Sequence, residues 1–124
     1  KPNMIVSGIS CSEQASIEEV AEHTVDCLKA TVPDDVPGCA FLSGGQNNEN
    51  ATAHLNMMNA KHEGNLPWNL SFSYGRALQA SALTTWSGKD ENIPVAQEAF
   101  LQRAKFNGMA TKGTYSEALE TEMA

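Results

Sequence analysis

Apolar residues near the start of the chain change from an irregular to a helical pattern. Residues 5–15 contain several serines and show no periodicity, so we predict a loop there. From Ser16 onward apolar residues recur at helical spacing, and Ser16 and Glu19 fit a capping box. The pattern predicts a helix over residues 17–31, which ends at Val32-Pro33 because proline cannot continue it. Core packing explains its apolar stripe, which consists of Ile17, Val20, Ala21, Val25 and Leu28.

Two later segments have the apolar patterns of strands. Residues 39–43 form a short apolar run that meets a serine and two glycines, which predicts a buried strand with an abrupt end. Residues 68–74 alternate large apolar side chains with asparagine and serine, which predicts a second strand. We expect one face of this second strand to pack on helices and the other to line a polar interior.

Helical spacing returns between and after these strands. It predicts a helix over residues 51–60 and a short helix over residues 78–86 that ends at Gly88. Asn92 and Pro94 then open a last helix. The expected inner face of this last helix consists of Val95, Ala96, Ala99 and Phe100.

The order of these elements indicates an α/β fold. Strands that alternate with helices imply a parallel sheet with crossover connections. In such folds ligands gather at the carboxyl ends of the strands, and both predicted strands end in segments that contain glycine. At 124 residues the chain is expected to be one domain or part of one, with residues 113–124 as a mobile, polar tail.

Charge and hydropathy argue against two classes of partner. The formal net charge of −7 argues against nucleic acid, because a phosphate backbone selects for an excess of Lys and Arg. No apolar run approaches the ~20 residues that a membrane helix needs, and no signal peptide is recognisable, so we expect no membrane partner. A small anionic substrate is still compatible with the negative net charge, because a basic group beside the substrate outweighs distant surface charges at short range.

The cysteines and histidines give no pattern typical of metal binding. Cys11, Cys27 and Cys39 are an odd number without CxxC spacing, which favours reduced thiols and a cytoplasmic location. The histidines also lack ligand spacing, and they are His23, His54 and His62. We therefore expect no metal, and ordinary surface or core roles for the histidines.

The two strand ends carry the candidate chemistry. Ser43-Gly44-Gly45 follows the first strand, and the N–H groups of such a turn can bind an anion together with the Ser43 hydroxyl. Gly75-Arg76 follows the second strand, and the planar guanidinium of Arg76 suits phosphate or carboxylate. Ser73, on the polar face of that strand, is placed to hydrogen-bond a substrate hydroxyl. Together these residues predict one phosphate site, with a plain turn at each strand end as the alternative.

Three longer strings contain or precede these motifs. They are Lys1-Pro2-Asn3-Met4, Phe41-Leu42-Ser43-Gly44-Gly45-Gln46 and Phe72-Ser73-Tyr74-Gly75-Arg76-Ala77-Leu78-Gln79. In this order they closely resemble class I fructose-1,6-bisphosphate aldolase, and the similarity covers almost the whole chain, including Trp68 and Trp86. The resemblance implies a (β/α)8 TIM barrel, of which residues 1–124 form the carboxyl-terminal part, from the end of strand six through helix eight.

The resemblance also implies an activity. Lys1 falls on the family's Schiff-base lysine, whose neutral amine adds to a ketose carbonyl and forms an iminium that accepts electrons when a C–C bond breaks. The positions that match the family's substrate-binding residues are Ser43, Gly44, Gly45, Ser73, Gly75 and Arg76. The implied enzyme is a glycolytic lyase that reversibly cleaves fructose 1,6-bisphosphate to dihydroxyacetone phosphate and glyceraldehyde 3-phosphate. It is expected to be cytoplasmic, to need no metal or cofactor, and to form homo-oligomers, often tetramers, at full length.

Part of the family's pattern lies upstream of Lys1. The family's first five strands, its catalytic carboxylates and its second active-site lysine precede that position, and its flexible carboxyl tail is not seen after Ala124. We therefore expect these 124 residues to be inactive alone. Two alternatives remain open. One is a Schiff-base aldolase for another phosphorylated ketose, such as sedoheptulose 1,7-bisphosphate, and the other is a non-catalytic phosphate-binding or interaction module.

Overall fold

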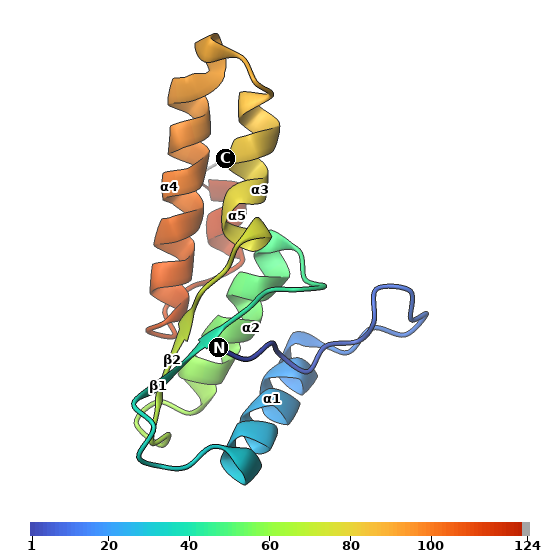
Figure 1. Ribbon diagram of the computed structural model, residues 1–124, viewed down its shortest axis with the longest axis vertical. Coiled ribbons are helices and arrows are strands. Elements are labelled where there is room, and N and C mark those ends of the chain that lie inside the picture. The colour runs from blue at the N-terminus through green and yellow to red at the C-terminus, as the bar shows by residue number, and fades with distance from the viewer. Residues whose placement is uncertain (123–124) are drawn as a thin grey trace.

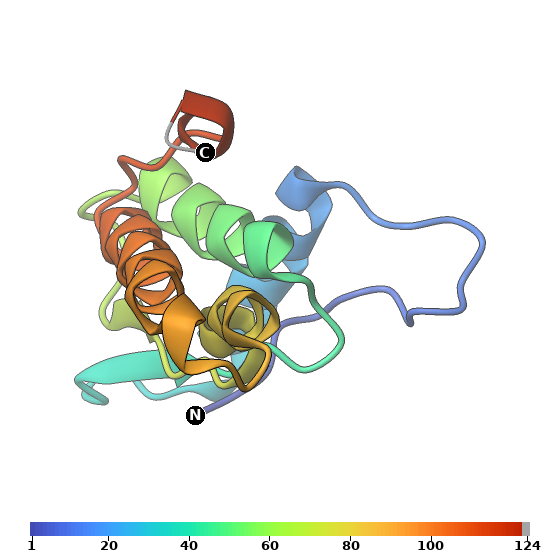
Figure 2. The same cartoon turned by 90° about the horizontal axis from the view of Figure 1, so that it is seen from above.

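The computed structural model describes residues 1–122 and has an α/β architecture (Figure 1). In chain order its elements are α1 (Ile17–Thr31), β1 (Gly38–Phe41), α2 (Asn48–Lys61), β2 (Asn69–Phe72), α3 (Arg76–Trp86), the 3-10 helix η1 (Asp90–Asn92), α4 (Ile93–Ala110) and α5 (Ala118–Glu122). In the described part, the sheet consists of two parallel strands, β1 and β2. Helices α2, α3 and α4 lie to one side of these strands (Figure 2). The α/β class predicted from the element order is confirmed.

Helix α1 has the bounds that the sequence predicts. Ser16 Oγ accepts from Glu19 N at 3.1 Å and Glu19 Oε2 accepts from Ser16 N at 3.4 Å, so the capping box forms. Val32 adopts an extended backbone, with φ −103°, and ends the helix before Pro33. The predicted stripe is buried at Val20, Ala21, Val25 and Leu28. Core packing is therefore the role of this helix.

Both strands are shorter than the apolar patterns predict. The parallel ladder runs from Gly38 opposite Asn69 to Phe41 opposite Phe72. Beyond the ladder, the Leu42 N–H donates to Pro2 O at 2.8 Å. The predicted strand over residues 39–43 therefore leaves the ladder early, and residues 1–4 lie beside its end.

Helices α2 and α3 begin earlier than predicted. Asn47 Oδ1 accepts from Asn50 N at 2.8 Å and caps α2, which therefore includes the polar residues before Ala51. Gly75 turns the chain directly from β2 into α3, so the helix begins at Arg76 instead of residue 78. Its end before Gly88, where φ is 73°, agrees with the prediction.

Helix α4 starts at Ile93, as predicted, but its buried face is different. Ala96 is buried and Ala99 half-buried, whereas Val95 and Phe100 are 62% and 39% exposed. The other buried positions lie farther along and are Arg103, Phe106, Asn107 and Ala110. The physical reason is visible in Figure 1, where the first part of α4 pairs with α3 in a hairpin that projects beyond α2. The core begins where α4 reaches α2.

The segment after α4 is docked on the helices, which corrects the prediction of a mobile tail. Tyr115 is buried, and its N–H donates to Asn56 Oδ1 of α2 at 2.9 Å. Arg103 of α4 donates to both carboxylate oxygens of Glu120. Polar composition suggested mobility, but these side chains find partners on α2 and α4. The remaining tail positions, residues 123–124, lie outside the described residues.

An apolar groove of about 490 Å³ runs between α3 and α4. Its large apolar side chains are Leu83, Trp86, Ile93 and Phe100, and each is more than a third exposed. Among residues 1–122, no helix has the length and apolar character that a membrane crossing requires.

Candidate functional site

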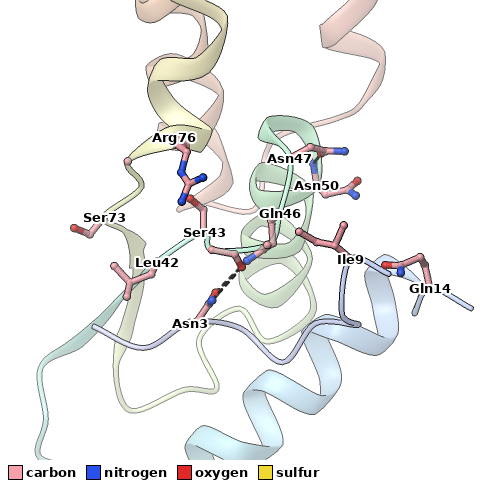
Figure 3. Close-up of a pocket in the computed structure, with 13 residues that line it drawn as sticks. Asn3, Ile9, Gln14, Leu42, Ser43, Gln46, Asn47, Asn50, Ser73 and Arg76 are labelled. Atoms are coloured by element: carbon pink, nitrogen blue, oxygen red, sulfur yellow. Dashed lines mark hydrogen bonds between the residues drawn. The ribbon is translucent and has the colours of Figure 1, made fainter. Parts of the chain in front are cut away.

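A cavity of about 710 Å³ opens at the carboxyl ends of β1 and β2 (Figure 3). The turn after β1 forms one wall and the start of α3 another, while Ile9 and Gln14 reach the cavity from the loop before α1. The residues of the lining that the sequence predicts as site residues are Ser43, Gly44, Gly45, Ser73, Gly75 and Arg76. The fold thus brings the two predicted strand-end motifs together in one space.

The turn after β1 presents backbone groups to this cavity. The Gln46 N–H donates to Ser43 O at 3.0 Å and closes the turn. Gly45 has a φ of 79°, in the left-handed region that favours glycine. Ser43 is buried in the wall of the cavity. Successive N–H groups in such a turn form a concave surface that can bind an anion.

The start of α3 supplies a second set of donors. Within the described residues no side chain caps this helix, because its N-cap is Gly75. The first N–H groups of a helix lack partners inside the helix and lie at the positive end of its dipole, which favours anions. Arg76 follows at once, and its guanidinium points toward Ser43 in Figure 3. Among the described lining residues Arg76 alone is charged, so the cavity combines neutral donors with one positive charge.

Lys1 does not line the cavity, unlike the other predicted site residues. It is exposed, and it is not one of the 13 residues of the described chain that line the cavity. Pro2 O accepts a hydrogen bond from the Leu42 N–H at the end of β1, and Asn3 lines the cavity. Lys1 therefore precedes a segment that is attached to the site, and its participation stays a prediction.

A polar chain behind the turn was missed by sequence reasoning. His54 Nδ1–H donates to Gln46 Oε1 at 2.7 Å, and Gln46 Nε2 donates to Asn3 Oδ1 at 3.4 Å. Asn3 Nδ2 in turn donates to Gly44 O at 3.0 Å. Burial lowers the pKa of His54 to about 4, so this imidazole is neutral at pH 7 and one ring nitrogen carries the proton. No spacing rule could find this chain, because its members come from separate segments.

The neighbours Ser73 and Tyr74 have different roles, since Ser73 lies at the site and Tyr74 in the core. Ser73 is half-buried and lines the cavity, as its position on the polar face of the second strand predicts. The Tyr74 hydroxyl donates to Ala51 O at 2.8 Å, and burial raises the pKa of Tyr74 above its ordinary value. Tyr74 therefore has a packing role, as expected.

The described residues contain no group of three or more His, Cys, Asp or Glu side chains arranged to hold a metal ion. Cys11 and Cys27 are exposed, Cys39 is buried, and all are free thiols. The free thiols agree with the predicted reduced state.

Comparison with known proteins identifies the family. The glycolytic family described as Fructose-bisphosphate aldolase class-I matches residues 1–124. The chain is 58% identical over 117 residues to the probable fructose-bisphosphate aldolase class 1 of Xanthomonas axonopodis pv. citri (strain 306), a match that covers 93% of this chain and 34% of that protein. It is 56% identical over 115 residues to a fructose-bisphosphate aldolase, cytoplasmic isozyme, of Cicer arietinum, covering 93% of this chain and 32% of that protein.

A solved structure agrees with these relatives. Fructose-bisphosphate aldolase from Plasmodium falciparum, in complex with TRAP and a small molecule inhibitor, superposes with a TM-score of 0.86 and 50% sequence identity. The match covers 93% of this chain and 33% of that one. The chain therefore belongs to the class I fructose-bisphosphate aldolase family. It spans about a third of the length of the relatives it matches.

Proposed function

We propose that this chain is the carboxyl-terminal part of the barrel of a fructose-bisphosphate aldolase, from the end of strand six through helix eight. Family membership supports this assignment, as does the parallel β1–α2–β2 order with a cavity at the carboxyl ends of the strands. In the proposed barrel, residues 1–4 end strand six, β1 is strand seven and β2 is strand eight. The whole protein cleaves fructose 1,6-bisphosphate reversibly to dihydroxyacetone phosphate and glyceraldehyde 3-phosphate.

The observation that carries the proposal is the shared cavity of Ser43-Gly44-Gly45 and Gly75-Arg76. One phosphate of the sugar accepts hydrogen bonds from the N–H groups of the turn and of the first residues of α3. Arg76 offsets its charge with bidentate donors. The Ser73 hydroxyl bonds a sugar hydroxyl. Held in this way, the substrate has its carbonyl at a fixed distance from Lys1.

Lys1 supplies the covalent chemistry of the proposed reaction. Its neutral amine attacks the ketose carbonyl, a C–N bond forms, and the carbonyl oxygen leaves as water to give an iminium. When the C3–C4 bond, one bond away from the iminium carbon, breaks, its electron pair moves toward the iminium nitrogen and gives an enamine. The C4 hydroxyl loses its proton to a general base in the same step, and C4 leaves as the carbonyl carbon of the aldehyde. Protonation of the enamine carbon and hydrolysis of the imine then release dihydroxyacetone phosphate and restore the amine. Neither a metal nor a cofactor takes part.

The setting of the proposed enzyme follows from its relatives and its charge. The name of the Cicer arietinum relative, a cytoplasmic isozyme, supports a cytoplasmic location. The formal net charge of −7 argues against a nucleic-acid partner and leaves a phosphorylated sugar as the ligand. We expect the whole protein to be a homo-oligomer, and sedimentation of that protein tests this expectation.

Imine trapping tests the proposed function. The experiment uses the whole-barrel protein, which we define as this chain together with the upstream part of the proposed barrel. Incubation with dihydroxyacetone phosphate and borohydride is expected to leave a stable adduct that peptide mapping assigns to the Lys1 side chain. Lys1→Arg is the control, because it keeps a positive charge but has no amine that forms the imine. An active protein without an adduct at Lys1 contradicts the proposal.

The same protein separates the alternatives. A higher kcat/KM for sedoheptulose 1,7-bisphosphate than for fructose 1,6-bisphosphate favours a Schiff-base aldolase with a different preferred substrate. Binding of inorganic phosphate at the cavity without any adduct, and without cleavage of either sugar, favours a non-catalytic phosphate-binding module.

A further inference from the structure

The side chain of Asn3 bridges two segments that the proposed reaction must keep in register. Its Nδ2 donates to Gly44 O at 3.0 Å, in the turn after β1, as the dashed line in Figure 3 shows. Its Oδ1 accepts from the Met4 N–H at 2.8 Å, which fixes the amide against its own backbone. A single side chain thus joins the segment that follows Lys1 to the candidate phosphate turn.

The turn is shaped to admit this amide. A Cβ atom at Gly44 would lie 3.1 Å from Asn3 Nδ2, closer than such contacts normally are. The φ of Gly44 lies outside the left-handed region, in contrast to Gly45, where φ is 79°. Glycine at position 44 is therefore explained by the close approach of Asn3, and glycine at position 45 by backbone conformation.

A second pair of residues supports Asn3 from behind. Gln46 Nε2 donates to Asn3 Oδ1 at 3.4 Å, and His54 Nδ1–H donates to Gln46 Oε1 at 2.7 Å. His54 is 5% exposed and belongs to α2, so the network is anchored in the core. The network runs from the buried His54 to the exposed Asn3, and its hydrogen bonds restrain the Asn3 amide to one orientation.

We propose that Asn3 is a positioning residue that couples phosphate binding to imine formation at Lys1. The inference rests on the proposed function, in which the turn binds a phosphate of the sugar. The Pro2 O–Leu42 N bond and the Asn3 Nδ2–Gly44 O bond fix the backbone next to Lys1 relative to that phosphate. A ketose held by its phosphate then presents its carbonyl to the amine, whereas a ketose without phosphate gains nothing from this bridge.

The test compares two ketoses in the whole-barrel protein. Borohydride trapping rates at Lys1 are measured with dihydroxyacetone phosphate and with dihydroxyacetone, and their ratio gives the advantage that the phosphate confers. Asn3→Ala is expected to lower this ratio about five- to tenfold, as loss of one oriented hydrogen bond does, while the trapping rate with dihydroxyacetone stays the same. Inhibition by inorganic phosphate is expected to change less than about twofold, since the turn keeps its own donors.

A second variant approaches the same contact from the other side. Gly44→Ala keeps Asn3 and presses a methyl group against its amide. It is expected to lower the trapping ratio by itself and to have little further effect in the Asn3→Ala background. Matched controls are Asn65→Ala, at an exposed asparagine before β2, and Gly108→Ala, where a Cβ meets nothing within 4 Å.

Each outcome decides between coupling and a structural role. An unchanged ratio in both Asn3→Ala and Gly44→Ala overturns the proposal. A loss of phosphate inhibition equal to the loss of trapping also overturns it, because Asn3 then merely maintains the turn. If the unsubstituted protein forms no adduct at Lys1 with either ketose, the proposed function fails, and this result is separate from any effect of Asn3. If Asn3→Ala does not fold, Gly44→Ala alone carries the comparison.

Discussion

Arg103 on α4 donates from both terminal nitrogens to the two carboxylate oxygens of Glu120 on α5, at 2.8 and 2.9 Å. The pair is enclosed, since the exposed fractions of the two side chains are 7% and 20%. Arg103 Nη1 also donates to Thr52 Oγ1 on α2 at 3.2 Å, and the Tyr115 hydroxyl donates to Glu120 Oε1 at 2.6 Å. The ion pair therefore joins α2, α4 and α5, and solvent screens it less than a surface pair.

Glu120→Ala is expected to destabilise the protein by about 2–3 kcal/mol, because it leaves the largely buried Arg103 charge with its Thr52 hydrogen bond and, among the described residues, a single carboxylate partner. That partner is Glu49, whose carboxylate lies 3.6 Å from Arg103 Nη2. The measurement is the free energy of unfolding from urea denaturation. Glu122→Ala removes an exposed carboxylate from the same helix and serves as the control. Equal stability of the two variants means that the pair contributes nothing.

His54 is expected to make the stability depend on pH in a defined window. Burial lowers its pKa from 6.5 to about 4, so the unfolded state takes up the proton first as the pH falls. The contribution of the neutral imidazole, about 3 kcal/mol, is present above pH 6.5 and is lost as the pH falls toward 4. His54→Gln should flatten the stability curve in this window relative to the unsubstituted protein. His23→Gln, at an exposed histidine, should leave the curve unchanged, and an equal flattening there refutes the assignment.

Arg76→Ala is expected to lower kcat/KM of the whole-barrel protein about ten- to a hundredfold, mainly through KM. A charge-assisted hydrogen bond to phosphate contributes about 1.5–3 kcal/mol, which corresponds to this range. If the phosphate also orients the carbonyl, kcat falls as well. Lys89→Ala removes an exposed cation outside the lining of the cavity and provides the matched control. Unchanged kinetics with a phosphorylated substrate remove Arg76 from the site.

The 124 residues by themselves are expected to be inactive in an aldol-cleavage assay. In the described part, two strands form the sheet and no Asp or Glu lines the cavity, whereas a complete (β/α)8 barrel has about 250 residues. Missing general acid–base groups typically cost about 10²–10⁴-fold in rate. The assay compares the isolated chain with the chain mixed with the upstream part of the barrel. Activity of the isolated chain near that of the whole-barrel protein contradicts the expectation.

Local chemistry explains which parts of the fold the sequence predicts well. The bounds of α1 follow from Ser16, Glu19 and Pro33, all of which act within one turn of the helix end. Strand ends are harder, because the point where Leu42 leaves the ladder depends on its bond to Pro2, from a distant part of the chain. The prediction of the buried face of α4 was wrong for a similar reason. Helical periodicity identifies an apolar side but not the neighbouring helix that covers it.

The residues of the candidate site also differ in whether a local sequence signal identifies them. Gly44, Gly45 and Gly75-Arg76 stand out because glycine after a strand is a local signal, and the fold brings these motifs to one cavity. Asn3, Gln46 and His54 carry no such signal, since an amide or imidazole acquires its role here only from partners in other segments. The docking of Tyr115 was missed likewise, because composition reports polarity and not the partners that a side chain meets.

The apolar groove between α3 and α4 has an optical consequence. The chain has two tryptophans, and they lie in opposite surroundings. Trp68 is 4% exposed and its Nε1 donates to Pro33 O at 3.1 Å, whereas Trp86 is 41% exposed in the groove. Indole emission moves to shorter wavelength when water is removed, so any surface that covers the groove shifts the Trp86 component and leaves the Trp68 component in place. The difference spectrum between the protein and its Trp86→Phe variant therefore reports coverage of the groove without an added label.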